Sequence, residues 1–408
     1  MEKSRLKAYA KTIVRIGANV QKGQEVFITI GVEHEDFAFL LSKECYAAGA
    51  KKVFFNWTSQ KLEKLMYQKE KLDSLMNVRS FQIERFKYMA QELPATIYIL
   101  SDDPNGLDGI DHLKFGKARQ SFSQAIKSYR DAMDDKQQWT IAALPTKKWA
   151  KKVFPHETTS EAMKKLGNLI LDVSRIDDDP LLAWEKHNAF LKNQAQKLNQ
   201  LGIDYLHYTN TLGTDFKVWL IPDSHFIAGS ETIPGTKITY NPNMPSEECF
   251  ITPLKGKAEG RVYATKPLSY NGQLIDDFYL DFKDGKVVDF KAKVGQNVLE
   301  TMLNMDAGAR MLGEVALVPY DSPISKSNVL FYETLFDENA SCHLALGRGF
   351  AASFNDFDKY TLKELYEKGL NDSLIHVDFM MGSKDLKIVA YLKSGEKVLI
   401  FKDGNWAL

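Results

Sequence analysis

The sequence predicts two domains: an α/β N-terminal domain with a largely parallel sheet, followed by an α+β C-terminal domain with antiparallel sheet. In the first half, short apolar runs alternate with amphipathic segments, which is typical of β-α-β units. In the second half the runs alternate polar and apolar residues and are separated by Asp-Gly turn dipeptides. A length of 408 residues with 44% hydrophobic residues is sufficient for two substantial cores.

The first half opens with an amphipathic helix, in which Leu6, Tyr9 and Ile13 share one face. A β-α-β unit follows, because two apolar runs flank a helical segment that ends at Gly49. The stretch GVEHED after the first strand lacks a phosphate-binding glycine loop, so we interpret this half as a scaffold. The expected elements are strands 25–30, 51–57, 95–100 and 138–144 and helices 36–48 and 117–133.

A polar, acidic connector at residues 174–180 marks the predicted boundary between domains 1–178 and 179–408. Beyond it, Trp184 and His187 fall on one face of a long helix, where His187 is interpreted as a histidine at the edge of the core. From Ile203 onward the alternating runs predict antiparallel strands, with turns at Asp284-Gly285 and Asp403-Gly404.

The overall composition excludes several classes of protein. Lysine plus arginine and aspartate plus glutamate both total 53, so no charge bias indicates nucleic acid or an anionic membrane. No apolar run approaches the length of a membrane span. Three cysteines without a C-x-x-C pair fit a reducing compartment, so we expect a cytoplasmic protein.

The stretch DSLIHVDFMMG places His376 and Asp378 two residues apart in an apolar run. On a strand such residues project from the same face, so the imidazole and the carboxylate converge. Both groups are ordinary ligands of divalent first-row metal ions. Taken alone, the pair is more typical of a partly buried ion pair than of a metal site.

The second half contains further acids and a histidine in apolar surroundings. Each has an ordinary interpretation by itself, such as a loop charge, an ion pair, a turn acid or a hydrogen-bonded core histidine. These ordinary interpretations do not suffice for the set as a whole. Several carboxylates in one domain repel one another, and lysine or arginine is scarce in these runs. Two divalent ions would neutralise them and would activate a water for amide hydrolysis. These residues are Glu247 or Glu248, Glu314, Asp337, Glu338 and His343.

Four runs carry a family resemblance: NMPSEECF, GARMLGEVALVP, FYETLFDENASCHLALG and HVDFMMG. In order and spacing they resemble the motifs of the M29 metallopeptidases, which include aminopeptidases T and S and PepS. The resemblance extends over nearly the whole chain, for example at GTDFKVWL and PTKKWAKKVFP.

The resemblance implies a cytoplasmic, homodimeric hydrolase that removes N-terminal residues from peptides with free N-termini. It implies two divalent ions per chain, with Zn, Co, Mn and Mg as candidates, held in the C-terminal domain. Glu314 would bridge the two ions, and Glu248 is preferred over Glu247 because the motif keeps the acid directly before the apolar strand. The implied ligands are Glu248, Glu314, Glu338, His343, His376 and Asp378.

One position departs from the family pattern. Seven residues after His343 the family usually has a tyrosine that is proposed to assist catalysis, whereas this chain has Phe350. A phenol can donate a hydrogen bond to a developing oxyanion and a phenyl ring cannot. The catalytic residues therefore stay unassigned, and a peptide-binding relative with impaired catalysis is an alternative.

A different alternative is a dinucleotide-dependent oxidoreductase. The stretch GRGFAA, residues 347–352, matches G-x-G-x-x-A after an apolar run. This fingerprint requires a βαβ unit, which the run containing His343 does not clearly open.

Overall fold

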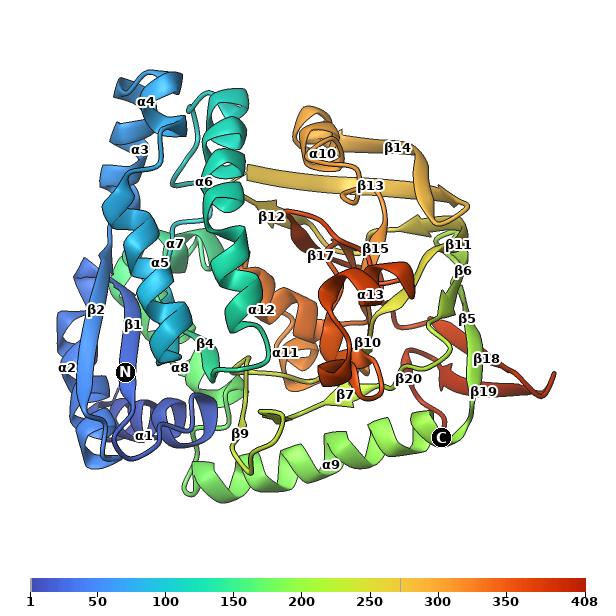
Figure 1. The fold of residues 1–408 in the computed structure, drawn as a ribbon, viewed down its shortest axis with the longest axis horizontal. Coiled ribbons are helices and arrows are strands. Elements are labelled where there is room, and N and C mark those ends of the chain that lie inside the picture. The colour runs from blue at the N-terminus through green and yellow to red at the C-terminus, as the bar shows by residue number, and fades with distance from the viewer. Residues whose placement is uncertain (1, 272) are drawn as a thin grey trace. The chain divides into compact units, whose positions relative to one another are not determined.

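The computed structural model describes residues 2–271 and 273–408 (Figure 1). The chain divides into two compact units. The first comprises Met1–Asn188 and Ser230–Ser246, and the second comprises Ala189–Gly229 and Glu247–Leu408.

A four-stranded parallel sheet forms the centre of the first unit, in the order β2-β1-β3-β4. Each strand is one of the apolar runs that the sequence predicts, and the parallel arrangement confirms the β-α-β interpretation of this half. The strands are β1 (Glu25–Gly31), β2 (Lys52–Thr58), β3 (Ala95–Leu100) and β4 (Trp139–Ala143).

Helices cover both faces of this sheet (Figure 1). On one face, Phe27 of β1 stacks on Phe54 of β2, and Tyr88 of α5 contacts both rings. On the other face, α1 and α2 pack together through the rings of Tyr9 and Phe37. The helices are α1 (Lys3–Thr12), α2 (Glu35–Ala47), α3 (Gln60–Lys69), α4 (Leu72–Met76), α5 (Ser80–Glu92), α6 (His112–Met133), α7 (Lys147–Val153) and α8 (Thr159–Val173).

The second unit contains two larger antiparallel sheets. A nine-stranded sheet has the order β12-β13-β11-β6-β5-β18-β19-β20, with β14 paired to β13. Its strands are β5 (Ile203–Thr209), β6 (Asp215–Leu220), β11 (Pro253–Tyr263), β12 (Leu268–Tyr270), β13 (Gln273–Lys283), β14 (Lys286–Val294), β18 (Lys387–Leu392), β19 (Lys397–Lys402) and β20 (Asn405–Trp406).

A five-stranded sheet completes the second unit, in the order β17-β16-β15-β10-β7. Its strands are β7 (Ile227–Ala228), β10 (Cys249–Ile251), β15 (Leu312–Leu317), β16 (His343–Gly347) and β17 (His376–Met380). The main helices are α10 (Gln296–Leu303), α11 (Pro323–Lys326), α12 (Thr334–Asp337) and α13 (Leu362–Glu367). Short 3-10 helices occur at η3 (Glu338–Ala340), η4 (Ala351–Ser353) and η5 (Phe357–Lys359).

One hydrophobic core joins the two sheets of the second unit. Phe216 and Val218 of the nine-stranded sheet belong to the same buried cluster as Val315, Leu344 and Phe379 of the five-stranded sheet. Each strand of the five-stranded sheet therefore turns one face toward this core. The other face is free to carry polar groups.

The structure adds details to the predicted order of elements. The first helix continues through a π-helical turn, η1 (Ile13–Gly17), and the long helix after the connector is α9 (Pro180–Gln200), which begins in the first unit and ends in the second. A two-stranded ribbon of β8 (Glu231–Thr232) and β9 (Thr239–Tyr240) lies in the segment Ser230–Ser246, which returns to the first unit. Among the described residues, no helix is long and apolar enough to cross a membrane.

Candidate metal centre

The five-stranded sheet places acids and histidines on the face opposite the core. Along β15, Val315 packs into the core, so the neighbouring Glu314 projects from the other face. Glu314 and Asp378 are both register partners of Ala345, which lies on the strand between them. Because Ala345 carries only a methyl group, the two carboxylates have space to approach a common ligand.

Five of the residues implied by the sequence form two groups of possible metal-ligand atoms. In the first group, His343 Nε2 lies 3.0 Å from Glu248 Oε2 and 3.9 Å from Glu314 Oε1. In the second, His376 Nε2 lies 3.1 Å from Glu314 Oε2 and 3.4 Å from Asp378 Oδ1. Within each group the ligand atoms all lie within 4.8 Å of one another. Glu314 belongs to both groups, with a different oxygen facing each histidine.

Backbone carbonyls orient both imidazole rings. His343 Nδ1 lies 2.9 Å from the Glu338 carbonyl oxygen, and His376 Nδ1 lies 2.7 Å from the Arg348 carbonyl oxygen. When Nδ1 donates to these oxygens, Nε2 of each ring faces the carboxylates. This is the usual arrangement of histidines that bind metal ions, whose second nitrogen donates to a carbonyl or carboxylate.

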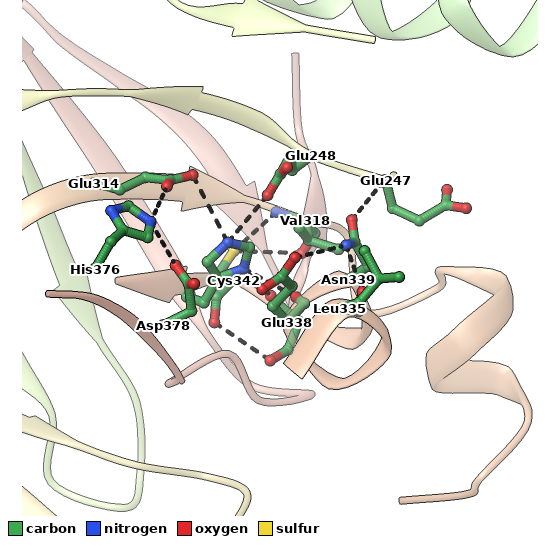
Figure 2. A network of polar contacts seen from close by, with 12 residues as sticks. Glu247, Glu248, Glu314, Val318, Leu335, Glu338, Asn339, Cys342, His376 and Asp378 are labelled. Atoms are coloured by element: carbon green, nitrogen blue, oxygen red, sulfur yellow. Dashed lines mark hydrogen bonds and ion pairs between the residues drawn. The ribbon is translucent and has the colours of Figure 1, made fainter. Parts of the chain in front are cut away.

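Glu338 is buried beside these groups but belongs to neither of them. Its carboxylate accepts a hydrogen bond from Asn339 Nδ2 at 3.3 Å. The Asn339 amide also accepts the backbone N–H of Glu247 at 2.6 Å, as Figure 2 shows. Asn339 therefore joins the 3-10 turn η3 to the segment that precedes β10. The sequence interpretation missed this residue, although its position directly after Glu338 was a signal.

The two adjacent glutamates have different orientations. In Figure 2 the Glu248 side chain points toward the cluster, whereas the Glu247 carboxylate points away from it. This difference agrees with the choice of Glu248 as the candidate ligand.

The carboxylates raise the pKa of both histidines. Burial alone lowers the pKa of His343, but the hydrogen bond and charge of Glu248 outweigh it and raise this pKa to about 9. Burial likewise lowers the pKa of His376, but the nearby carboxylates of Asp378 and Glu314 outweigh it and raise this pKa well above its ordinary value. In the absence of a metal ion, both rings are therefore protonated on both nitrogens and positively charged near neutral pH.

Burial also retains protons on two of the acids. It raises the pKa of Glu314 to about 7, with further increases from the charges of Glu248 and Asp378 and a decrease from the His376 hydrogen bond. Burial and the nearby charge of Asp378 raise the pKa of Glu338 well above its ordinary value. Asp378 differs, because His376 outweighs the effect of burial and lowers its pKa. No described lysine or arginine forms an ion pair with these carboxylates, so protons supply the compensating positive charge.

The cluster is more exposed at His376 and Asp378 than at His343 and Glu314. The His343 side chain is 1% exposed and the Glu314 side chain 6%, whereas those of His376 and Asp378 are 26% and 13% exposed. A ligand would therefore meet His376 and Asp378 first.

The donor set fits divalent metal ions. Carboxylate oxygens and imidazole nitrogens suit zinc, cobalt, manganese and, for the oxygens, magnesium. Asp378 Oδ1 is buried and accepts no well-formed hydrogen bond, although His376 approaches it as an ion pair. An unsatisfied buried carboxylate oxygen is costly unless a cation or a donor meets it.

Cys342, the cysteine beside His343, is buried, and burial raises the pKa of its thiol to about 12, so it does not supply a thiolate nucleophile near neutral pH. The interpretation of residues 347–352 as a dinucleotide-binding stretch is wrong. The stretch 347–352 follows β16 of an antiparallel sheet and leads into the three-residue 3-10 helix η4. A dinucleotide fingerprint needs a parallel β-α-β unit whose helix receives the pyrophosphate, and this segment provides neither.

Comparison with known proteins decides the family. The family described as thermophilic metalloprotease (M29) matches residues 2–406. The chain belongs to this metalloprotease family. Among its M29 relatives, aminopeptidase 2 of Geobacillus stearothermophilus is 40% identical over 404 residues, which cover 98% of this chain and 97% of that protein. Aminopeptidase AmpS of Bacillus subtilis (strain 168) is 39% identical over 405 residues, which cover 99% and 98% of the two chains.

A solved structure has the same fold throughout. Wild-type AmpT from Thermus thermophilus superposes with a TM-score of 0.90 at 32% identity, and the match covers 100% of both chains. The resemblance found in the sequence is therefore confirmed. Family membership implies a divalent metal cofactor, and the two groups that share Glu314 are the candidate ligands in this chain.

Proposed function

We propose that this chain is an aminopeptidase that hydrolyses the N-terminal peptide bond of peptides with two divalent metal ions. The observation that carries the proposal is the pair of ligand groups that share Glu314, one oxygen of which faces each histidine. A carboxylate in this position is suited to bridge two ions. The proposed ligands are Glu248, Glu314, Glu338, His343, His376 and Asp378.

Divalent ions at such a site polarise a peptide carbonyl and lower the pKa of a water toward ~7. The chain's own residues bind the substrate and carry the protons. The partly exposed carboxylate of Asp378 would attract the positively charged α-amino group of a peptide. A proton must also reach the leaving amine, and a carboxylate of the cluster would carry it there.

The domain assignment follows from where these residues lie. All six belong to the second unit, which supports a catalytic domain at residues 179–408 and a scaffold domain at 1–178, although residues 179–188 and 230–246 belong to the first unit. We also propose a cytoplasmic homodimer. The resemblance supports the dimer, and the compartment is supported by Cys45, Cys249 and Cys342, which are buried and unbridged.

The test compares two forms of one peptide on the metal-loaded protein. A leucyl peptide with a free N-terminus should release leucine, and its N-acetylated form should be inert. A chelator should abolish release, and nicotinamide cofactors should have no effect. Efficient cleavage of the acetylated peptide would contradict an aminopeptidase.

A second candidate function rests on Phe350. Its ring lies 4.8 Å from the ring of His376, beside the exposed end of the cluster, where it provides no hydrogen-bond donor. A relative that binds peptides without cleaving them would bind the free peptide when loaded with metal and release no amino acid. Measured release of leucine would exclude it.

A further inference from the structure

We infer that Gly313 is a positioning residue that orients two of the proposed metal ligands, Glu314 and His376. It acts through a β-bulge and through the backbone carbonyl of Arg348. The inference rests on the proposed function, because it explains how that site is held in shape.

The bulge lies directly before Glu314. Leu312 pairs with Leu346 of β16 and Glu314 pairs with the adjacent Ala345, so Gly313 is the extra residue on β15. In a regular strand, Leu312 and Glu314 would face the same side because they are two residues apart. Here Leu312 belongs to the hydrophobic core, while Glu314 faces His343 and His376. The bulge thus allows a core residue and a site residue at this spacing.

Gly313 also lies against the turn that follows β16. A Cβ atom at this position would lie 2.2 Å from the Arg348 carbonyl oxygen and 2.6 Å from that of Gly347. Both are backbone atoms, so a side chain at position 313 can be accommodated only if the turn moves.

The Arg348 carbonyl, which a side chain at position 313 would displace, is also the group that orients His376. The Arg348 oxygen lies 2.7 Å from His376 Nδ1, and the Arg348 N–H donates to the Ile375 carbonyl at 2.8 Å. Movement of this turn would therefore rotate or release the imidazole. Gly313 thus affects Glu314 as its chain neighbour and His376 through one hydrogen bond.

Asn371 holds the same turn from another direction. Its side-chain Nδ2 donates to the Gly347 carbonyl at 2.6 Å, and its backbone carbonyl accepts the Gly349 N–H at 3.0 Å. Asn371 is fully buried. Removing the side-chain amide of Asn371 loosens the turn without adding any atom to it.

The experiment measures the binding of cobalt(II) to the metal-free protein, by calorimetry and by visible absorption, which reports ligand geometry. Loss of an interaction that orients a ligand typically weakens metal binding ~10–100-fold. We therefore expect Gly313→Ala to weaken cobalt binding by about this factor and to alter the spectrum. Binding with wild-type affinity and spectrum would overturn the inference.

Gly260→Ala is the matched control for a general loss of stability. A Cβ at Gly260 would lie 2.1 Å from the Asp215 carbonyl oxygen, and its φ of +100° adds strain, but β11 carries none of the proposed ligands. This variant should unfold at lower urea concentration yet bind cobalt with wild-type affinity. Equal weakening in both variants would mean that Gly313 acts only through stability.

If Gly313→Ala does not fold, Asn371→Ser decides the question. Weaker cobalt binding with an altered spectrum in this variant supports the role of the turn, and unchanged binding overturns it. The proposed function fails separately, namely if the wild-type protein binds no divalent ion or cleaves no peptide. If the wild-type protein binds cobalt and cleaves peptides, and Gly313→Ala binds cobalt equally well, only the positioning role is contradicted.

Discussion

Glu314 Oε2 lies 3.1 Å from His376 Nε2, and the other oxygen of the same carboxylate faces His343 at 3.9 Å. Glu314 is thus the point at which two ligand groups meet, with ligands from β15, β16 and β17 and from Glu248, directly before β10. Among the described residues no lysine or arginine pairs with it, so its negative charge is balanced by the two histidines and by bound protons. Metal ions that bind here would replace those protons.

The adjacent glutamates provide a matched pair of variants. Glu248→Gln should lose one ion and ~10²-fold or more in activity, because even residues that only orient ligands are worth ~10–100-fold. Glu247→Gln should keep both ions, since its carboxylate points away from the cluster (Figure 2). Metal analysis of the two purified variants checks this, and the reverse result would place Glu247 in the site.

Metal binding should become stronger as pH rises. The pKa of His343 is raised to about 9 and that of Glu314 to about 7, so both hold protons at lower pH that a metal ion must displace. Affinity should increase roughly tenfold per pH unit for each proton released, most steeply below pH 7 and less up to about pH 9. Calorimetry in buffers of different ionisation enthalpy counts the protons. Binding without proton release at pH 7 would be inconsistent with these pKa shifts.

Phe350→Tyr tests whether the missing phenol limits catalysis. The new hydroxyl would be added to a ring that already contacts His376, where it can donate to a developing oxyanion. A donor of this kind is worth ~10²–10³ in kcat, so kcat should rise while KM changes little. Phe350→Leu, which adds no donor, is the control. An unchanged kcat in the tyrosine variant would show that another group already stabilises the oxyanion.

His187 should make the first unit sensitive to acid. Burial lowers its pKa to about 3, with a further decrease from the charge of Arg175 and a smaller opposing effect of its hydrogen bond to the Ser246 carbonyl. The unfolded chain binds this proton at an ordinary pKa near 6.5, so between pH 6.5 and pH 3 the free energy of unfolding falls as pH falls. The contribution is about 1.4 kcal/mol per pH unit.

His187→Gln removes this pH-dependent contribution to the free energy of unfolding and retains a hydrogen-bond donor for the Ser246 carbonyl. Urea unfolding at pH 7.5 and pH 5 should show a wild-type loss about 2 kcal/mol larger than that of the variant. The exposed His156→Gln is the control and should behave as wild type. Equal losses in wild type and His187→Gln would mean that His187 is protonated in the folded protein.

The alternation of apolar runs was sufficient to predict the parallel sheet and the change to antiparallel sheet. Strands such as Glu25–Gly31 and Ala95–Leu100 are short apolar runs, and helical segments lie between such strands, so each element can be recognised from its local sequence. The return of Ser230–Ser246 to the first unit was not predicted. It depends on distant hydrogen bonds, such as that from Met244 N to the Ile141 carbonyl, which have no local pattern.

Side-chain chemistry identified the candidate ligands but not what orients them. His376 and Asp378 are two residues apart on a strand, so their convergence follows from the pleat. The Arg348 carbonyl that orients His376 belongs to the backbone, which every residue type shares. Gly313 could not be recognised either, because its role depends on the close approach of a turn that follows another strand.

The most direct test is to count the metal ions bound per chain in wild type and in Glu314→Gln, with the exposed Glu300→Gln as a control. If Glu314 bridges two ions, wild type and Glu300→Gln should bind two, and Glu314→Gln should lose metal together with the release of leucine from a leucyl peptide. Two ions retained in Glu314→Gln would show that Glu314 is an ordinary ion-pair partner and would contradict the account.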